Sequence, residues 1–137
     1  MATGKMIRRM RAGIPVLDRI APLRQPLNAA MKYSTPFVCD MTALSNEDRL
    51  RHRQLADFLS SMLQAVQEIS DGYDFVFHFD PATYDALSQI TLLEHACCPF
   101  FAISIHLKPD RQLIWQLTGT EGVKQFIRME FVAWFEK

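Results

Sequence analysis

Residues 94–101, EHACCPFF, place a carboxylate, an imidazole and two adjacent thiols directly before a proline. Cys97 and Cys98 form the thiol pair, and Cys39 is the third cysteine of the 137-residue chain. Because an odd number of cysteines cannot pair completely within one chain, free thiols in a reducing compartment are the simpler interpretation. We therefore predict a cytoplasmic protein whose cysteines bind a metal, react, or pack in the core.

Thiolates select soft ions over hard ones, so Cu(I), Hg(II) and trivalent arsenic are the ions considered for this site. A closed zinc site usually spaces two local cysteines by two to four residues. Cys97 and Cys98 are adjacent, and we expect their side chains to diverge, which disfavours structural zinc. The predicted ligands of a soft metal or metalloid ion are Cys39, Cys97, Cys98 and Glu94.

Glu94 follows Leu87 by seven residues and Ile90 by four, so on a helix it shares their buried face. A carboxylate there requires a cation, a metal or a hydrogen-bond partner, or else it remains partly solvated at the helix end. His95 points about 100° away from Glu94 around a helix. It is a weaker candidate ligand, and His52 has a weaker claim still.

Two rival functions compete with ion binding, and the sequence does not decide whether any reaction is catalysed. A thiol oxidoreductase needs a thiolate stabilised by a neighbouring cation, and residues 92–101 contain no lysine or arginine. A non-enzymatic interaction module would instead use aromatic faces to form a homodimer. The aromatic residues predicted for that interface are Phe75, Phe77, Phe131 and Trp134.

Charge is balanced overall, with 15 basic and 15 acidic residues, which gives no global electrostatic case for nucleic acid. The N-terminal region departs from this balance, because residues 1–32 contain seven lysines and arginines and one acid. We interpret residues 1–34 as a basic, partly ordered extension and residues 35–137 as a single domain. No stretch has the roughly 18 consecutive apolar residues of a membrane span.

Hydrophobic patterns predict the elements that must position the thiols. Residues 35–41 form a short apolar run that could be a first strand and contain Cys39. Ser45 begins a capping box, and an apolar stripe at spacings of three and four predicts one helix from there to Ile69, before the Asp71-Gly72 break. Residues 73–80 alternate as a half-buried strand.

Pro81 fits the first turn of a second helix, which Pro99 must stop because a residue before proline is driven to extended conformations. Residues 101–107 and 113–117 alternate as an antiparallel hairpin. Residues 123–134 carry the stripe of a last helix, and Thr120 supplies a capping hydroxyl. The turn at residues 118–124 could hold an anion with Lys124, although ordinary capping explains it more simply.

The predicted class is α+β with the order (β)αβαββα. If residues 35–41 are a strand, this order matches thioredoxin-like topology, in which Cys39 would lie beside Cys97 and Cys98 near a loop containing Pro99. The chain has no C-x-x-C motif. Without that first strand, the alternative is a three-stranded antiparallel sheet packed with three helices.

Four segments together resemble a small family of uncharacterised bacterial proteins: residues 39–52 (CDMTALSNEDRLRH), 71–77 (DGYDFVF), 92–101 (LLEHACCPFF) and 117–126 (LTGTEGVKQF). The resemblance covers about residues 37–135 and implies no established activity. Members carry a cysteine before the first helix, a Glu-x-x-Cys-Cys-Pro-Phe segment and a Gly-x-Lys ending. The positions that the resemblance implies are Cys39, Glu94, Cys97, Cys98, Pro99 and Lys124.

Overall fold

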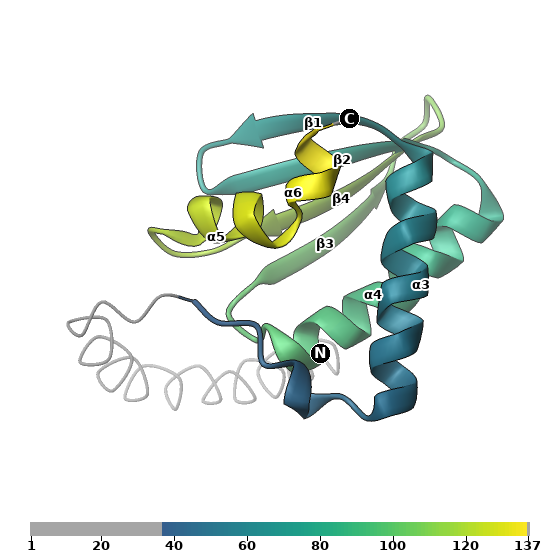
Figure 1. Ribbon diagram of the computed structural model, residues 1–137. Coiled ribbons are helices and arrows are strands. Elements are labelled where there is room, and N and C mark those ends of the chain that lie inside the picture. The colour runs from purple at the N-terminus through teal and green to yellow at the C-terminus, as the bar shows by residue number, and fades with distance from the viewer. Residues whose placement is uncertain (1–36, 137) are drawn as a thin grey trace, which may run out of the picture. The chain divides into compact units, whose positions relative to one another are not determined.

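Four antiparallel strands and four α-helices make up residues 37–136, the part of the chain that the computed structural model describes (Figure 1). In chain order the elements are the 3-10 turn η1 (Met41–Ala43), α3 (Asn46–Met62), β1 (Leu63–Ile69), β2 (Gly72–His78), α4 (Pro81–Cys97), β3 (Ala102–Leu107), β4 (Gln112–Thr118), α5 (Val123–Glu130) and α6 (Val132–Phe135). The predicted α+β class is confirmed. The basic extension predicted for residues 1–34 lies outside the described residues.

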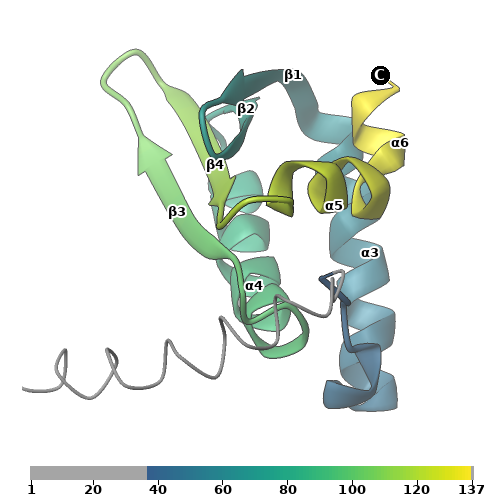
Figure 2. The same cartoon turned by 90° about the vertical axis from the view of Figure 1, so that its left-hand side faces the viewer.

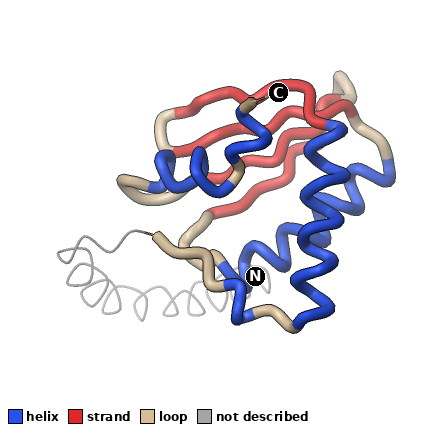
Figure 3. Tube along the Cα trace, in the orientation of Figure 1, coloured by secondary structure: helices blue, strands red, loops and turns tan. Residues whose placement is uncertain are grey.

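The strands form one sheet in the order β1-β2-β4-β3, and every neighbouring pair is antiparallel. The described helices lie on one side of this sheet, where α3 packs against α4 (Figures 2 and 3). The thioredoxin-like topology is therefore wrong, because it requires a parallel βαβ unit. Residues 37–40 form no strand, and η1 follows them.

The first helix begins as predicted and ends earlier than predicted. Ser45 caps α3 by accepting a hydrogen bond from the amide of Asp48, at 3.1 Å. The helix ends at Met62, and residues 63–69 form β1 instead of two further helical turns. A bulge between Leu63 and Ala65 pairs Leu63 with Phe77 and Val66 with Phe75. Leu63 and Val66 therefore share a sheet face at a spacing of three, which imitates the helical period.

The central elements follow the predicted pattern. Asp80 caps α4 by accepting hydrogen bonds from the amides of residues 82 and 83, and Pro81 occupies the first turn. The helix ends at Cys97, with Cys98 as a non-helical C-cap and a trans bond before Pro99. The predicted last helix is split at Phe131 into α5 and α6, and Gly122 rather than Thr120 is the N-cap of α5.

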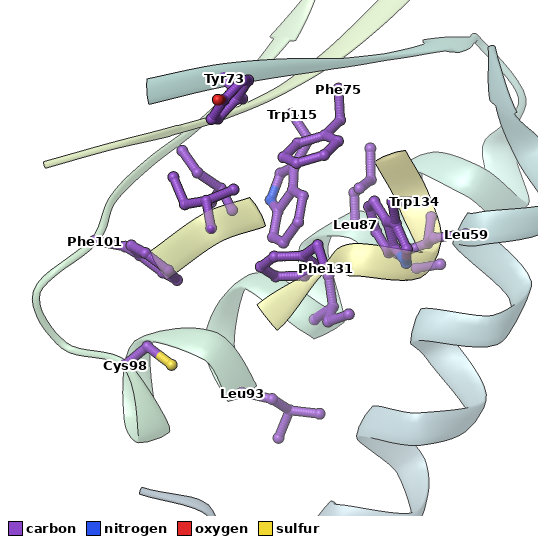
Figure 4. Close-up of a cluster of buried hydrophobic side chains, with 14 of the residues drawn as sticks. Leu59, Tyr73, Phe75, Leu87, Leu93, Cys98, Phe101, Trp115, Phe131 and Trp134 are labelled. Atoms are coloured by element: carbon purple, nitrogen blue, oxygen red, sulfur yellow. The ribbon is translucent and has the colours of Figure 1, made fainter. Parts of the chain in front are cut away.

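The sheet face that carries Tyr73, Phe75 and Phe77 packs beneath the helices (Figure 4). Phe75 contacts four rings of this cluster with centroids 5.2–5.9 Å apart: Trp115, Phe131, Trp134 and Phe135. The residues predicted for a dimer interface are instead core residues, with exposures of 0% for Phe75 and Phe77, 6% for Phe131 and 4% for Trp134. Closure of the core by α5 and α6 removes these rings from any surface.

None of the helices in residues 37–136 has the length and apolarity to cross a membrane.

Candidate metal site

The three cysteine sulfurs converge at the C-terminal end of α4. Cys39 Sγ lies 3.3 Å from Cys97 Sγ, and Cys97 Sγ lies 3.8 Å from Cys98 Sγ. All three sulfurs lie within 4.8 Å of one another. The predicted proximity of Cys39 to the cysteine pair is confirmed, although a thioredoxin-like strand is not what produces it.

Adjacent cysteine side chains do not diverge here, which corrects the expectation from their spacing. Cys97 is the last residue of α4, whereas Cys98 leaves helical geometry with φ −131° and ψ 68°. This change of backbone direction at the helix end brings the two sulfurs to 3.8 Å. The sequence argument against zinc assumed that both residues share one regular conformation, so that argument no longer holds.

Backbone hydrogen bonds hold the segment that carries Cys39 against the end of α4. The amide of Asp40 donates to the carbonyl of Cys97 at 2.8 Å, so it satisfies a carbonyl that the helix end leaves free. The amide of Cys98 donates to the carbonyl of Glu94 at 2.6 Å. These two bonds fix the backbone on both sides of the sulfur cluster.

The sulfurs differ in their access to solvent. Cys97 and Cys98 are both 0% exposed, whereas Cys39 is half-buried. Met41 also lies here, with its Sδ 3.7 Å from Cys39 Sγ. An incoming ion would therefore reach the cluster from the side of Cys39.

Glu94 is paired with His52 of α3 rather than with its neighbour His95. His52 Nε2 lies 2.6 Å from Glu94 Oε1, and the two side chains are 17% and 3% exposed. His95 is exposed on the outer side of α4. The sequence contains a signal for His52, since it precedes Leu55 by three residues and Leu59 by seven and so shares their helix face.

The Glu94 hydrogen bond raises the pKa of His52, and this effect outweighs the opposing effect of burial. A protonated His52 is the cation that residues 92–101 lack. Hydrogen bonding from Cys39 is the main cause of the lowered pKa of Cys97. A hydrogen bond from Cys98 and the charge of His52 lower that pKa further. Hydrogen bonding to Cys97 raises the pKa of Cys39. Hydrogen bonding to Cys39 and Cys97 likewise raises the pKa of Cys98, so Cys97 is the thiol of the three that ionises most readily.

Glu130 of α5 lies near enough to the cluster for the charges of Glu94 and Cys97 to affect it, and the sequence analysis missed it. Desolvation is the main cause of its raised pKa, and the charges of Glu94 and Cys97 raise that pKa further. Glu130 follows Val123 by seven residues and Ile127 by three, so it lies on their buried helix face. Its side chain is nevertheless exposed to solvent.

Two overlapping groups of side chains could hold a metal ion. One comprises Cys39, Cys97 and Cys98, and the other comprises His52, Glu94 and Cys97. In each group the ligand atoms lie within 4.8 Å of one another. Cys97 belongs to both groups, so the second group adds a nitrogen and an oxygen beside the three sulfurs.

The remaining predicted site residues stay outside the cluster. Lys124 forms an ion pair with Glu68 of β1, and its ammonium lies 5.8 Å from the centre of the Tyr73 ring. Pro99 is exposed in the turn after α4. Lys124 thus links α5 to the sheet. Pro99 follows the end of α4 and is not a ligand.

No protein-family model matches the chain, and no curated protein or solved structure matches it either. The resemblance to an uncharacterised bacterial family stays a prediction.

Proposed function

We propose that this protein binds a soft metal or metalloid ion through the sulfurs of Cys39, Cys97 and Cys98. The convergence of three free thiols from two distant parts of the chain carries this proposal, since a packed core does not require it. Thiolates are the preferred ligands of soft ions. His52 and Glu94 lie beside the sulfurs and balance each other's charge.

The spacing of the sulfurs favours three or four ligands around one ion. With a metal–sulfur bond of about 2.3 Å, separations of 3.3 and 3.8 Å correspond to angles of about 90° and 110° at the ion. A linear, two-coordinate ion would need sulfurs about 4.6 Å apart at the same bond length. For the Cys39–Cys97 and Cys97–Cys98 pairs, pyramidal or tetrahedral coordination therefore needs less movement than linear coordination.

The position at the end of α4 also favours a cation. The C-terminal end of a helix carries partial negative charge, which attracts cations. Reactive thiolates are more typical of helix N-termini, where the dipole stabilises the anion. At this helix end the thiolate of Cys97 depends on neighbouring hydrogen bonds and on His52, and a bound cation would stabilise it further.

Native mass spectrometry of the reduced full-length chain, titrated with Cu(I), Zn(II) and trivalent arsenic, tests this proposal. We expect one soft ion per wild-type chain. Cys39→Ala and the double variant Cys97→Ala/Cys98→Ala should each lose it, because each removes sulfurs from the same cluster. Circular dichroism verifies that both variants remain folded.

His95→Ala is the matched control, because His95 is a neighbouring ligand type that is exposed away from the sulfurs. It should bind the ion like the wild type. The proposal fails if no soft ion forms a stoichiometric adduct with the wild type. It also fails if the adduct survives in both cysteine variants.

A thiol oxidoreductase is the second candidate, favoured by the 3.3 Å contact between Cys39 and Cys97. The partly exposed Cys39 would pass its proton to the Cys97 thiolate and attack a small-molecule disulfide RSSR as a thiolate, which releases RS⁻. Cys97 would then displace the second RS group as RSH and form a Cys39–Cys97 disulfide. The charge and the proton count are unchanged. A mixed disulfide trapped on Cys39 in a Cys97→Ala variant would support this activity, and its absence would exclude this reaction sequence.

A further inference from the structure

A fourth sulfur, from a methionine, contacts the cluster through Cys39. Met41 Sδ lies 3.7 Å from Cys39 Sγ, which lies 3.3 Å from Cys97 Sγ, which in turn lies 3.8 Å from Cys98 Sγ. In a tetrahedron of sulfurs around an ion with bonds of about 2.3 Å, the sulfurs are about 3.8 Å apart. The Met41 contact is therefore as close as the contacts within the cysteine group.

The backbone fixes Met41 in this position. Met41 is the first residue of η1, and the amide of its N-cap Asp40 donates to the carbonyl of Cys97. The carbonyl of Met41 accepts a 3.1 Å hydrogen bond from the amide of Leu44. The same bond that brings Cys39 to α4 therefore also brings Met41 there. The side chain is half-buried against the core.

The thioether distinguishes between the soft ions. A thioether is neutral and soft, and Cu(I) is among the ions that thioether and thiolate ligands bind in preference to hard ions. It adds no negative charge, which matters because Glu94 is buried beside the sulfurs and each further thiolate would be an additional buried anion. Trivalent arsenic is neutralised by three thiolates and gains little from a fourth, uncharged sulfur.

We propose that Met41 is a thioether ligand and that the ion bound at this site is Cu(I). This inference rests on the proposed function, since it names the ion that the three-thiol site takes. Cu(I) would be held by cysteine sulfurs together with Met41 Sδ, with Cys39 and Met41 on the side open to solvent.

Met41→Leu tests the inference because leucine keeps the apolar volume and removes only the sulfur. Cu(I) affinity is measured by competition with a chromophoric Cu(I) chelator, and trivalent arsenic binding is measured on the same samples. We expect Met41→Leu to weaken Cu(I) binding roughly 10- to 100-fold, the range typical of losing a supporting group at a metal site. Binding of trivalent arsenic should be unchanged.

Met129→Leu is the matched control, since Met129 on α5 is 76% exposed. It should leave both affinities unchanged. Equal Cu(I) affinity in Met41→Leu and wild type would overturn the inference and assign Met41 to packing. A wild type that binds trivalent arsenic and not Cu(I) would also overturn it, while leaving the three-thiol site intact. Binding of neither ion would remove the proposed function itself.

Discussion

The ring cluster around Phe75 and the sulfur cluster around Cys97 are both buried, but they are built from opposite chemistry. Phe75, Trp115, Phe131 and Trp134 contact one another through aromatic rings, and the Trp115 indole donates to Thr91 Oγ1 at 2.9 Å. The sulfur cluster lies beside a buried carboxylate and an imidazole. In Figure 4, Cys98 stands at the margin of the core, away from these rings.

The two clusters differ in whether hydrophobic packing alone accounts for their residues. Burial of large rings stabilises a fold, provided that a buried indole N–H such as that of Trp115 has a hydrogen-bond partner. A carboxylate that is 3% exposed costs free energy unless a partner is held beside it. The chain supplies that partner from 42 residues away, so the end of α4 carries polar groups that a stable core does not need.

Phe75→Ala should give the largest effect on stability, because it leaves a cavity among four rings. We expect a loss of about 3–5 kcal/mol in the free energy of unfolding, measured by urea denaturation. Val132→Ala is the control, since Val132 is 52% exposed, and its effect should stay within about 0.5 kcal/mol. Chains of the Phe75 variant that remain folded should keep the wild-type ion stoichiometry. A loss of ion binding in folded chains would mean that the two clusters are coupled.

His52→Ala should have the next largest effect on stability, because it leaves Glu94 buried without its partner. We expect a loss of about 2–3 kcal/mol. Adding Glu94→Gln to His52→Ala should recover part of that loss, since a neutral amide is less costly to bury than an unpaired carboxylate. If the double variant is less stable than His52→Ala, then burial of the unpaired Glu94 carboxylate does not cause the loss of stability in His52→Ala.

The pH dependence of stability distinguishes the two clusters, and this test needs no substitution that creates a cavity. The folded pKa of His52 is raised above its unfolded value of 6.5, so its contribution is complete below that value and is lost as the pH rises through the folded pKa. The stability difference between wild type and His52→Gln should therefore shrink as the pH rises above 6.5. Unfolding curves over this range measure it. A difference that stays constant with pH would contradict the assigned charge of His52.

Thr91→Val should give the smallest effect, because it keeps the shape and removes only the hydroxyl, which accepts from the Trp115 indole and donates to the Leu87 carbonyl of its own helix. Leaving the Trp115 indole N–H unpaired should cost about 1–2 kcal/mol. Thr91→Ser retains the hydroxyl and should lose less. Neither variant should change ion binding, and a change in ion affinity would show that the ring cluster influences the site.

Local signals made much of the fold predictable. Ser45 and Pro81 act on the helix turn beside them, and each marks a helix start that the structure contains. Strand β1 was missed because its bulge repeats Leu63 and Val66 at a helical spacing. A one-residue insertion in a strand leaves no local composition signal, so only the pairing with β2 reveals it.

The site was predictable in its residue types and not in its partners. Cys39, Cys97 and Cys98 were identified because clustered thiols are rare in a chain with three cysteines. The pair formed by Glu94 and His52 depends on how α3 crosses α4, which no short segment specifies. His95, the nearer histidine in sequence, was favoured over His52 for that reason.

X-ray absorption spectroscopy at the copper edge, on the reduced chain with one equivalent of Cu(I), tests the central claim most directly. The account predicts a first shell of sulfur alone, three or four atoms at about 2.3 Å, from the cluster of Cys39, Cys97 and Cys98 with Met41. A shell dominated by nitrogen and oxygen would contradict it and assign the ion to the group of His52, Glu94 and Cys97.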